Sequence, residues 1–599
     1  MNIDLIREIS IEDKAISHFS SFTLQQAFNA HHYFELRFNH DQIGEPGLIT
    51  LDDSRDFVGK TLSATFGHAM GTLQKFSGLV TKVELSQSHG YHGVLIVSGY
   101  SPTILIDRGP DLGSYLDKTL DDIVTLATND TPQNDLRIVS NATRKNPIDY
   151  VIQYRESDFD FLNRLSGEYY EWFYYDGENL NFGKPDQQKE VSLFYGRDLH
   201  NLQYAMGVAP IKNKRFAYNP KQDEMLQAET SGNAEGRPDL VHAINASNSM
   251  FSKTFNQPAS IRVENNNDIT NHVEYQEKAN ISKLLKVSAT GDNPEVGIGT
   301  IVDITMSIKK DLSFNTESLG QFLVTSISHS IDERGHYQNT FEGVVSTTER
   351  LAADDFQRPN PDMQLADVID NNDPQGSGRI KVKFKWACQT NDVTEWLRVI
   401  TPDAGSSESV SKNRGLVFIP EIGDQVLVSF EEGNIARPIV LGSVFHGKSG
   451  SGGSSSNNNK SITSKSGHTF TMDDAGGMLL KDRSGLNHIS IDGTNAITVT
   501  SDNNVTLQTG NVMIIMDKEN DKIIIQAKNI EIRAADDFKL TGDGAPSKNG
   551  SIEFQEKLSI TSKNELFMVG ETSAKLNSES VNIVGSKTFI DGKPVKINS

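Results

Sequence analysis

The chain has 599 residues, with 57 lysines and arginines against 79 aspartates and glutamates, which gives a formal charge of −22. This acidity counts against a general nucleic-acid binder and against docking on an anionic membrane, because both need a basic face. The single cysteine, Cys388, excludes an internal disulfide. No apolar run approaches the about 18–20 residues of a membrane span, and the N-terminus lacks the apolar core of a signal peptide. We therefore expect cytoplasmic assembly, with any export by a route that does not use an N-terminal signal.

Residues 1–372 are predicted to form a mainly β domain with a few helices. Short β-rich runs, such as 33–38 (YFELRF) and 93–97 (GVLIV), alternate with Gly, Asp and Asn turns. Residues 115–128 and 157–170 instead repeat apolar side chains with helical spacing, and Ser157 suits the N-cap of the second helix. This pattern favours a domain built on β-barrels or sandwiches.

Residues 373–448 are predicted to form a compact all-β domain. Side chains alternate in character through 379–386, and three further strand-like runs follow at 395–401, 417–420 and 425–431. A domain of this length with short strands suits a small closed barrel of the OB type.

One face of the first strand of this barrel is basic, and OB barrels can bind single-stranded nucleic acid through a basic groove with aromatic platforms. Trp386, however, shares its face with the apolar side chains of the strand, which indicates a core position. We therefore expect no nucleic-acid partner. The basic side chains are Arg379, Lys381, Lys383 and Lys385.

The sequence changes character after the barrel. Residues 449–459 (SGSGGSSSNNN) have the composition of a flexible linker. Residues 460–599 contain no Trp or Tyr, and apolar–x–apolar triads recur mostly every seven or eight residues. Such periodicity indicates a repeat architecture.

Each triad predicts a short strand with one dry face and one wet face. A strand this short buries few apolar side chains in a single chain and leaves sheet edges open. We therefore expect an intertwined trimeric β-helix, or β-prism, over 460–599; a single-chain β-solenoid is the alternative. The side chains predicted to line the trimer axis are Ile489, Ile491, Ile497, Val499, Val505, Leu507, Ile523, Ile525, Ile530 and Ile532.

The combination resembles VgrG-type spike proteins of type VI secretion systems, which are similar to phage tail hub and needle proteins. The most specific match is 151–183, where the signature residues are Gln153, Tyr154, Glu156, Ser157, Asp158, Phe161, Arg164 and Leu165. Residues 320–343 resemble the strand pair that closes the hub barrels. Segments 378–384, 396–402, 419–430 and 437–442 resemble the family's OB barrel. Glu421 and the turn 433–437 depart from the family pattern and could alter what the barrel contacts.

The resemblance implies a hub of two β-barrel-like modules over 1–372, an OB-fold collar and a needle. It implies a homotrimeric, secreted spike on the tail tube of a contractile machine. The implied partners are an Hcp-like tube and baseplate proteins at the hub, a PAAR-like tip protein and effector cargo. The target membrane is met by mechanical puncture alone. The spike of an extracellular contractile injection particle and a trimeric tail-fibre-like adhesin are alternatives.

No enzyme motif is apparent, and we expect neither catalysis nor a cofactor or metal. The adjacent His31 and His32 are predicted to differ in burial rather than to ligate a metal together, and Cys388 lacks an activating pattern. Apolar residues still alternate towards the C-terminus, which predicts that this end binds the tip protein. The predicted tip-docking side chains are Phe589, Ile590, Val595 and Ile597.

Overall fold

The computed structural model describes residues 5–43, 51, 54–87, 93–132, 134–310, 313–353, 356–387, 392–541, 551–570 and 572–592. The chain divides into two compact units, Met1–Asn458 and Asn459–Ser599. Cys388, Val595 and Ile597 lie outside the described residues. Within those residues, no helix combines the length and apolar character needed to cross a membrane.

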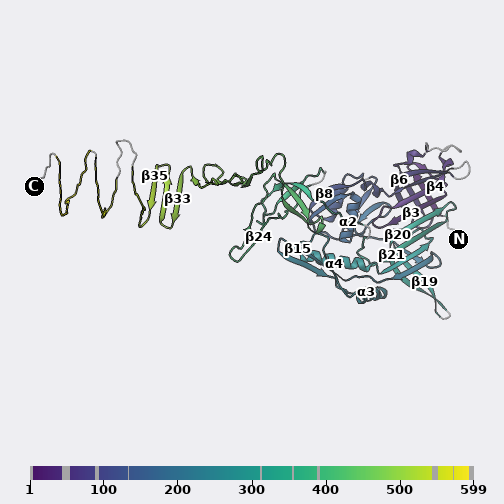
Figure 1. The fold of residues 1–599 in the computed structure, drawn as a ribbon. Helices are drawn as coiled ribbons and strands as arrows, with labels where there is room; N and C mark the ends of the chain where they lie inside the picture. The colour runs from purple at the N-terminus through teal and green to yellow at the C-terminus, as the bar shows by residue number, and fades with distance from the viewer. Residues whose placement is uncertain are drawn as a thin grey trace. The chain divides into compact units, whose positions relative to one another are not determined.

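A 13-stranded sheet organises the first unit, and several of its strands lie side by side in Figure 1. The strand β20 links its two halves, because it pairs with β19 and β21 along one part and with β3 along its final residues. The strands are β1 (Leu5–Ile11), β2 (Lys14–Ala15), β3 (Ser21–Ala27), β4 (Tyr33–Asn39), β5 (Thr61–His68), β6 (Gln74–Gln87), β7 (Gly93–Tyr100), β13 (Glu190–Phe194), β14 (Leu199–Met206), β18 (Leu285–Gly291), β19 (Ile301–Lys310), β20 (Ser313–Asp332) and β21 (Tyr337–Val345).

Two separate apolar cores lie against this sheet, one centred on the strands near the N-terminus and the other on β18–β21. Smaller sheets complete the region. They are formed by β8 (Asp111–Lys118) with β10 (Ile148–Glu156), by β9 (Arg137–Ser140), β11 (Phe173–Tyr175) and β12 (Asn179–Phe182), and by β15 (Asn213–Asn219), β16 (Glu224–Glu229) and β17 (Phe255–Pro258).

Four α-helices occur in the described chain, where the sequence predicts two. They are α1 (Leu120–Ala127), α2 (Asp158–Tyr169), α3 (Pro238–Met250) and α4 (Asn266–Ile281). The prediction of α2 is confirmed, with Ser157 as its N-cap. The predicted start of the first helix is wrong, because residues 115–118 belong to β8 and pair with β10. The Thr119–Asp122 capping box then begins α1.

The OB region is built on a four-stranded antiparallel sheet in the order β23–β22–β26–β27. Its strands are β22 (Gln364–Asp370), β23 (Lys381–Phe384), β26 (Gln425–Phe430) and β27 (Pro438–Ser443), and a short pair β24 (Ala404–Gly405) with β25 (Arg414–Gly415) lies between them in the sequence. The predicted strand at 395–401 is reduced to isolated bridges at Leu397 and Val399. Residues 417–420 form no strand, and Val417 and Phe418 are exposed.

The second unit consists of two antiparallel meanders. The first contains β28 (Asn459–Thr463), β29 (Thr469–Asp473), β30 (Met478–Lys481), β31 (His488–Ile491) and β32 (Ile497–Thr500). The second contains β33 (Asn504–Thr509), β34 (Val512–Asp517) and β35 (Lys522–Gln526), of which β33 and β35 are labelled in Figure 1. In the described residues after Gln526 the chain carries triads but no assigned strand.

Candidate functional site

The first meander of the C-terminal unit gathers predicted axis residues onto one face. In the pairing of β31 with β32, Ile489 lies opposite Val499 and Ile491 lies opposite Ile497. Side chains that face each other directly in an antiparallel pair project from the same side of the sheet. These four side chains therefore form one apolar face.

The second meander repeats this arrangement across three strands. Its pairing aligns two apolar rows, Val505 with Met516 and Ile523, and Leu507 with Ile514 and Ile525. The alternating side-chain direction of a strand sets both rows on one side of the sheet. Eight of the ten predicted axis residues thus lie in two apolar faces, and Ile530 and Ile532 follow the last strand.

The described residues of the single chain do not cover these apolar faces. The exposed fraction is 71% for Ile497, 69% for Ile523 and 55% for Val499, and Ile530 and Ile532 are also exposed. Contiguous apolar surface of this kind marks an interaction site in a stable protein. The outer strands of each meander also leave one ladder edge without a partner in the described chain.

The predicted axis set omits several members of these faces. Met478 lies opposite Ile491 and Leu480 lies opposite Ile489, while Ile514 and Met516 occupy the middle strand of the second meander. In the triad that starts at Met513, the two outer side chains project from the side of β34 opposite to the predicted axis side chains. A pattern of three consecutive apolar residues does not show which side chains share a face, because the strand register decides it.

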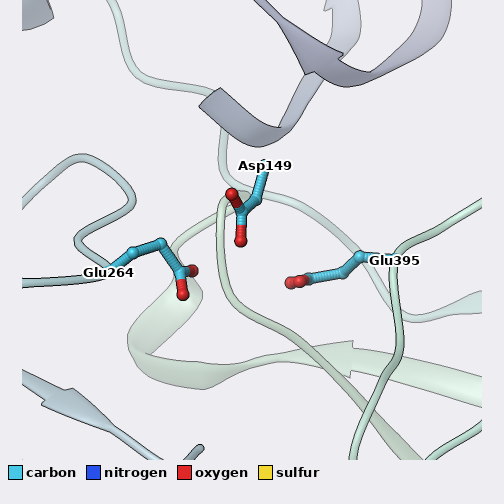
Figure 2. A group of neighbouring side chains, drawn as sticks. All are labelled: Asp149, Glu264 and Glu395. Carbon is cyan, nitrogen blue, oxygen red and sulfur yellow. The ribbon is translucent and has the colours of Figure 1, made fainter. Parts of the chain in front are cut away.

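A second group of polar side chains lies where the larger domain meets the OB region inside the first unit. Asp149 begins β10, Glu264 precedes α4 and Glu395 belongs to the OB region, and Figure 2 shows their carboxylates pointing towards one another. One oxygen of each lies within 4.8 Å of the others. Three carboxylates at this spacing raise the question of a metal site.

Two cations form ion pairs with the three carboxylates of this cluster. The Lys221 ammonium lies 2.9 Å from Asp149 and 2.8 Å from Glu264, and Arg262 contacts Glu264 at 2.5 Å and Glu395 at 2.6 Å. Burial would lower the pKa of Lys221, but its hydrogen bonds to Glu264 and Asp149 raise it overall. The arrangement is therefore an ion-pair network that joins the two domains.

The strand β10 and the helix α2 hold the two domains together through apolar contacts as well. Tyr150, Ile152 and Tyr154 pack in the OB core, whereas Val151, from the same strand, packs in the core beside α2. The Tyr154 hydroxyl also accepts a hydrogen bond from Gln364 at 3.0 Å. One strand thus contributes to both cores.

A buried charge cluster fixes α2 against β10. Arg164 donates to Glu156 at 2.6 Å and 2.8 Å, to Glu168 at 3.1 Å and to the Ile152 carbonyl at 2.7 Å. Burial would lower the pKa of the guanidinium, but the charges of Glu168 and Glu156 outweigh it and hold the pKa above its usual value. The guanidinium therefore stays charged in the folded protein.

Comparison with known proteins identifies both domains. Residues 48–333 match the phage tail baseplate hub family (GPD), and residues 364–445 match the type VI secretion system/phage-baseplate injector OB domain. The chain belongs to the VgrG-type spike and phage baseplate hub proteins. The proteins of these families are structural components of phage baseplates and type VI secretion systems.

The spike is similar to curated relatives over part of their length. Type VI secretion system spike protein VgrG1c of Pseudomonas aeruginosa is 43% identical over 72 residues, which cover 12% of this chain and 9% of the relative. Spike protein VgrG5 of the same organism is 24% identical over 339 residues, 50% of this chain and 40% of the relative. The chain thus spans less than half the length of these relatives.

Two solved structures have a similar fold over most of this chain. The lidded Francisella PdpA–VgrG complex matches with a TM-score of 0.53 and 8% identity, over 84% of this chain and 81% of that chain. The lidless complex gives a TM-score of 0.52, also at 8% identity, over 83% of this chain and 98% of that chain. At this identity the likeness shows the fold alone.

Three of the four predicted basic side chains of the OB region lie beside acids, and Lys381 lies over the ring of Trp396. Arg379 contacts Asp373 at 2.7 Å, Lys383 contacts Asp392 at 3.6 Å, and Lys385 contacts Asp367. Trp386 stacks on Phe384 with ring centroids 4.1 Å apart and packs against the barrel core, as predicted.

The structure describes the two adjacent histidines and two of the four predicted tip-docking residues. His32 is fully buried and His31 is half-buried against Phe159, which confirms that the two differ in burial. Phe589 and Ile590 are exposed by 87% and 67%, and the two other predicted tip-docking residues lie outside the described chain.

Proposed function

We propose that the spike acts as a homotrimer in which residues 460–599 of three chains form a shared β-prism. The observation that carries this proposal is the exposure of both apolar faces of the C-terminal unit in the single chain. Burying them between copies would gain about 25 cal/mol for each Å² of apolar surface removed from water. Equivalent faces from three chains would meet on one axis.

In this proposal the prism is the shaft of a puncturing needle at the end of a contractile tail tube. The domain over 1–372 would contact the tube and baseplate proteins, and the OB barrels would form a collar. Support comes from the hub and injector OB matches. The Francisella relative is seen in complex with PdpA, which supports a role bound to other proteins.

The distal end of the prism is proposed to bind a PAAR-like tip protein. Phe589 and Ile590 are apolar and exposed, and an apolar end of a prism favours a cap. Contraction would then carry the spike, the tip and any effector cargo out of the cytoplasm and into a target cell. The proposal includes no enzymatic step, since force does the work.

Two neighbouring residues test the shared axis. Ile497 belongs to the apolar face and Thr498 projects from the opposite side of β32, where it pairs with Ser490. Ile497 is exposed in the single chain, so Ile497→Asp costs a lone chain little, but in a prism it brings three unpaired carboxylates together. The cost there is on the order of several kcal/mol per chain.

We expect Ile497→Asp to abolish the trimer in chemical cross-linking and sedimentation velocity, while Thr498→Asp retains it. Circular dichroism of the first unit should not change in either variant. Trimers of undiminished stability in Ile497→Asp would contradict the axial assignment.

A further inference from the structure

A pocket of about 440 Å³ lies between three segments of the first unit. One wall comes from β15 and the residues around β17, the second from the connection ahead of the OB barrel, and the third from the barrel turn at residues 432–435. The charged side chains in its lining are Arg215, Arg358, Glu168 and Glu432. A ligand in this pocket would contact both domains at once.

Arg215 lacks an acidic partner in this pocket. Its Nε donates to Gln276 at 3.0 Å, and its Nη1 donates to Gln257 at 2.8 Å and to the Pro258 carbonyl at 3.3 Å. All three acceptors are neutral, and no described carboxylate lies within ion-pair distance of the guanidinium. Burial lowers the pKa of Arg215, and the charge of nearby Arg358 lowers it further.

The surrounding charges leave this guanidinium as an excess cation. The neighbouring arginines each have a carboxylate: Arg144 with Asp268 at 3.1 Å, Arg164 with Glu156 and Glu168, Arg350 with Glu171 at 2.9 Å, and Arg358 with Glu168 at 3.3 Å. Five arginines thus share four carboxylates. Glu432 at the rim lies near Arg437, at 3.4 Å.

The buried imidazole of His272 lies close enough to Arg215 and Arg358 to interact with their charges. Its Nε2 is buried without a hydrogen-bond partner, and the imidazole is completely enclosed. Burial, followed by the charges of Arg215 and Arg358, lowers the pKa of His272 to about 3. Arg215, whose guanidinium bonds only neutral acceptors, is the group that favours an anion here.

We propose that this pocket binds a phosphate-class oxyanion between the guanidinium groups of Arg215 and Arg358. The bonds described above engage Nε and Nη1 of Arg215 and Nε of Arg358, so N–H groups of both side chains remain for a ligand. Guanidinium groups bind phosphate through paired, charge-assisted hydrogen bonds. The bound anion connects β15 with the segment that leads into the OB barrel and stiffens the joint between the domains.

Isothermal titration of the full-length spike with inorganic phosphate and with pyrophosphate, at constant ionic strength in chloride, tests the proposal. We expect one saturable site per chain. Arg215→Gln and Arg358→Gln should each weaken binding about tenfold or more, as expected for loss of a charged hydrogen bond. Arg197→Gln is the matched control, because Arg197 is exposed beside Asp198 on another part of the chain.

Because Arg215 also bonds to Gln276, its variant is checked for folding by circular dichroism, and exposed Arg358 supplies the second variant. The proposal is overturned if no saturable heat appears, or if all three variants bind like the parent. Succinate that binds as tightly as pyrophosphate would overturn the assignment to phosphate chemistry. Because none of these readouts depends on assembly, failure here leaves the trimeric spike untouched.

Discussion

At the scale of single residues, Arg164 shows how one side chain of the family signature holds two elements together. It crosses from α2 to β10 and neutralises Glu156 and Glu168 out of contact with water. A carboxylate that loses such a partner in the interior remains buried and uncompensated. The signature therefore specifies the packing of a helix on a strand.

We predict that Arg164→Met lowers the free energy of unfolding of the first unit by about 3–5 kcal/mol. Arg37→Met is the matched control, because Arg37 is half-exposed and pairs with Glu35 on the surface, where such pairs contribute less than about 1 kcal/mol. Urea denaturation followed by tryptophan fluorescence measures both. Equal losses in the two variants would contradict the structural role of Arg164.

Residue-level prediction from the sequence succeeds where the cause is local. The N-cap role of Ser157 is predictable because its hydroxyl accepts a hydrogen bond from the backbone N–H only three residues later in the sequence. Arg215 and Glu395 give no such signal. The partners of Arg215 lie 42 to 61 residues away, and Arg262, which contacts Glu395, is separated from it by more than a hundred residues. Only the fold brings these groups together.

At the scale of elements, the sequence predicts strands better than helices. The period-two alternation of the C-terminal triads is visible because their polar face is wet, and β31, β32, β33 and β35 contain such triads in the predicted phase. The triad in β34 is out of phase, and the described triads after Gln526 have no assigned strand. The helix α4 was missed because its buried face includes His272, Gln276 and Glu277, which hide the helical stripe. Tertiary hydrogen bonds satisfy two of these groups: Arg215 donates to Gln276, and Ser231 and Gly232 donate to Glu277.

The contact between β3 and β20 contains a pH-sensitive link. Gln26 bridges two buried histidines, with its Nε2 3.0 Å from His32 Nδ1 and its Oε1 3.1 Å from His329 Nε2. The Tyr337 hydroxyl completes this hydrogen-bond network, 2.7 Å from His329 Nδ1. Burial lowers the pKa of both histidines from 6.5 to about 3, so both are neutral in the folded protein.

A histidine held neutral in the folded state stabilises the fold fully above its unfolded pKa and loses that contribution as pH falls towards the folded pKa. The window here runs from about pH 6.5 down to about 3. Between pH 7 and pH 5 we expect each histidine to cost about 2 kcal/mol of stability. Urea denaturation at both pH values should show a smaller loss in His329→Gln than in the parent. An unchanged loss would mean that His329 does not carry this link.

At the scale of the whole molecule, the two units differ in how they satisfy their apolar residues. The first unit has closed cores that span the 13-stranded sheet, the helices and the OB region. The second has strands but no described core, and its large apolar side chains remain exposed. A unit that lacks its own core gains stability from association with identical copies.

The sequence predicts this difference in outline. The absence of Trp and Tyr after residue 460 and the two-residue dry face of each triad indicate a unit without a single-chain core. Which side chains share a face depended on the register of β33 to β35, because a shift by one residue exchanges the faces.

The most direct test of the proposed spike is its mass in solution, measured by light scattering on the purified full-length chain. We predict a particle of three times the 66.1 kDa of one chain, unchanged on dilution. A stable particle with the mass of one chain would contradict the shared prism and the puncturing role built on it.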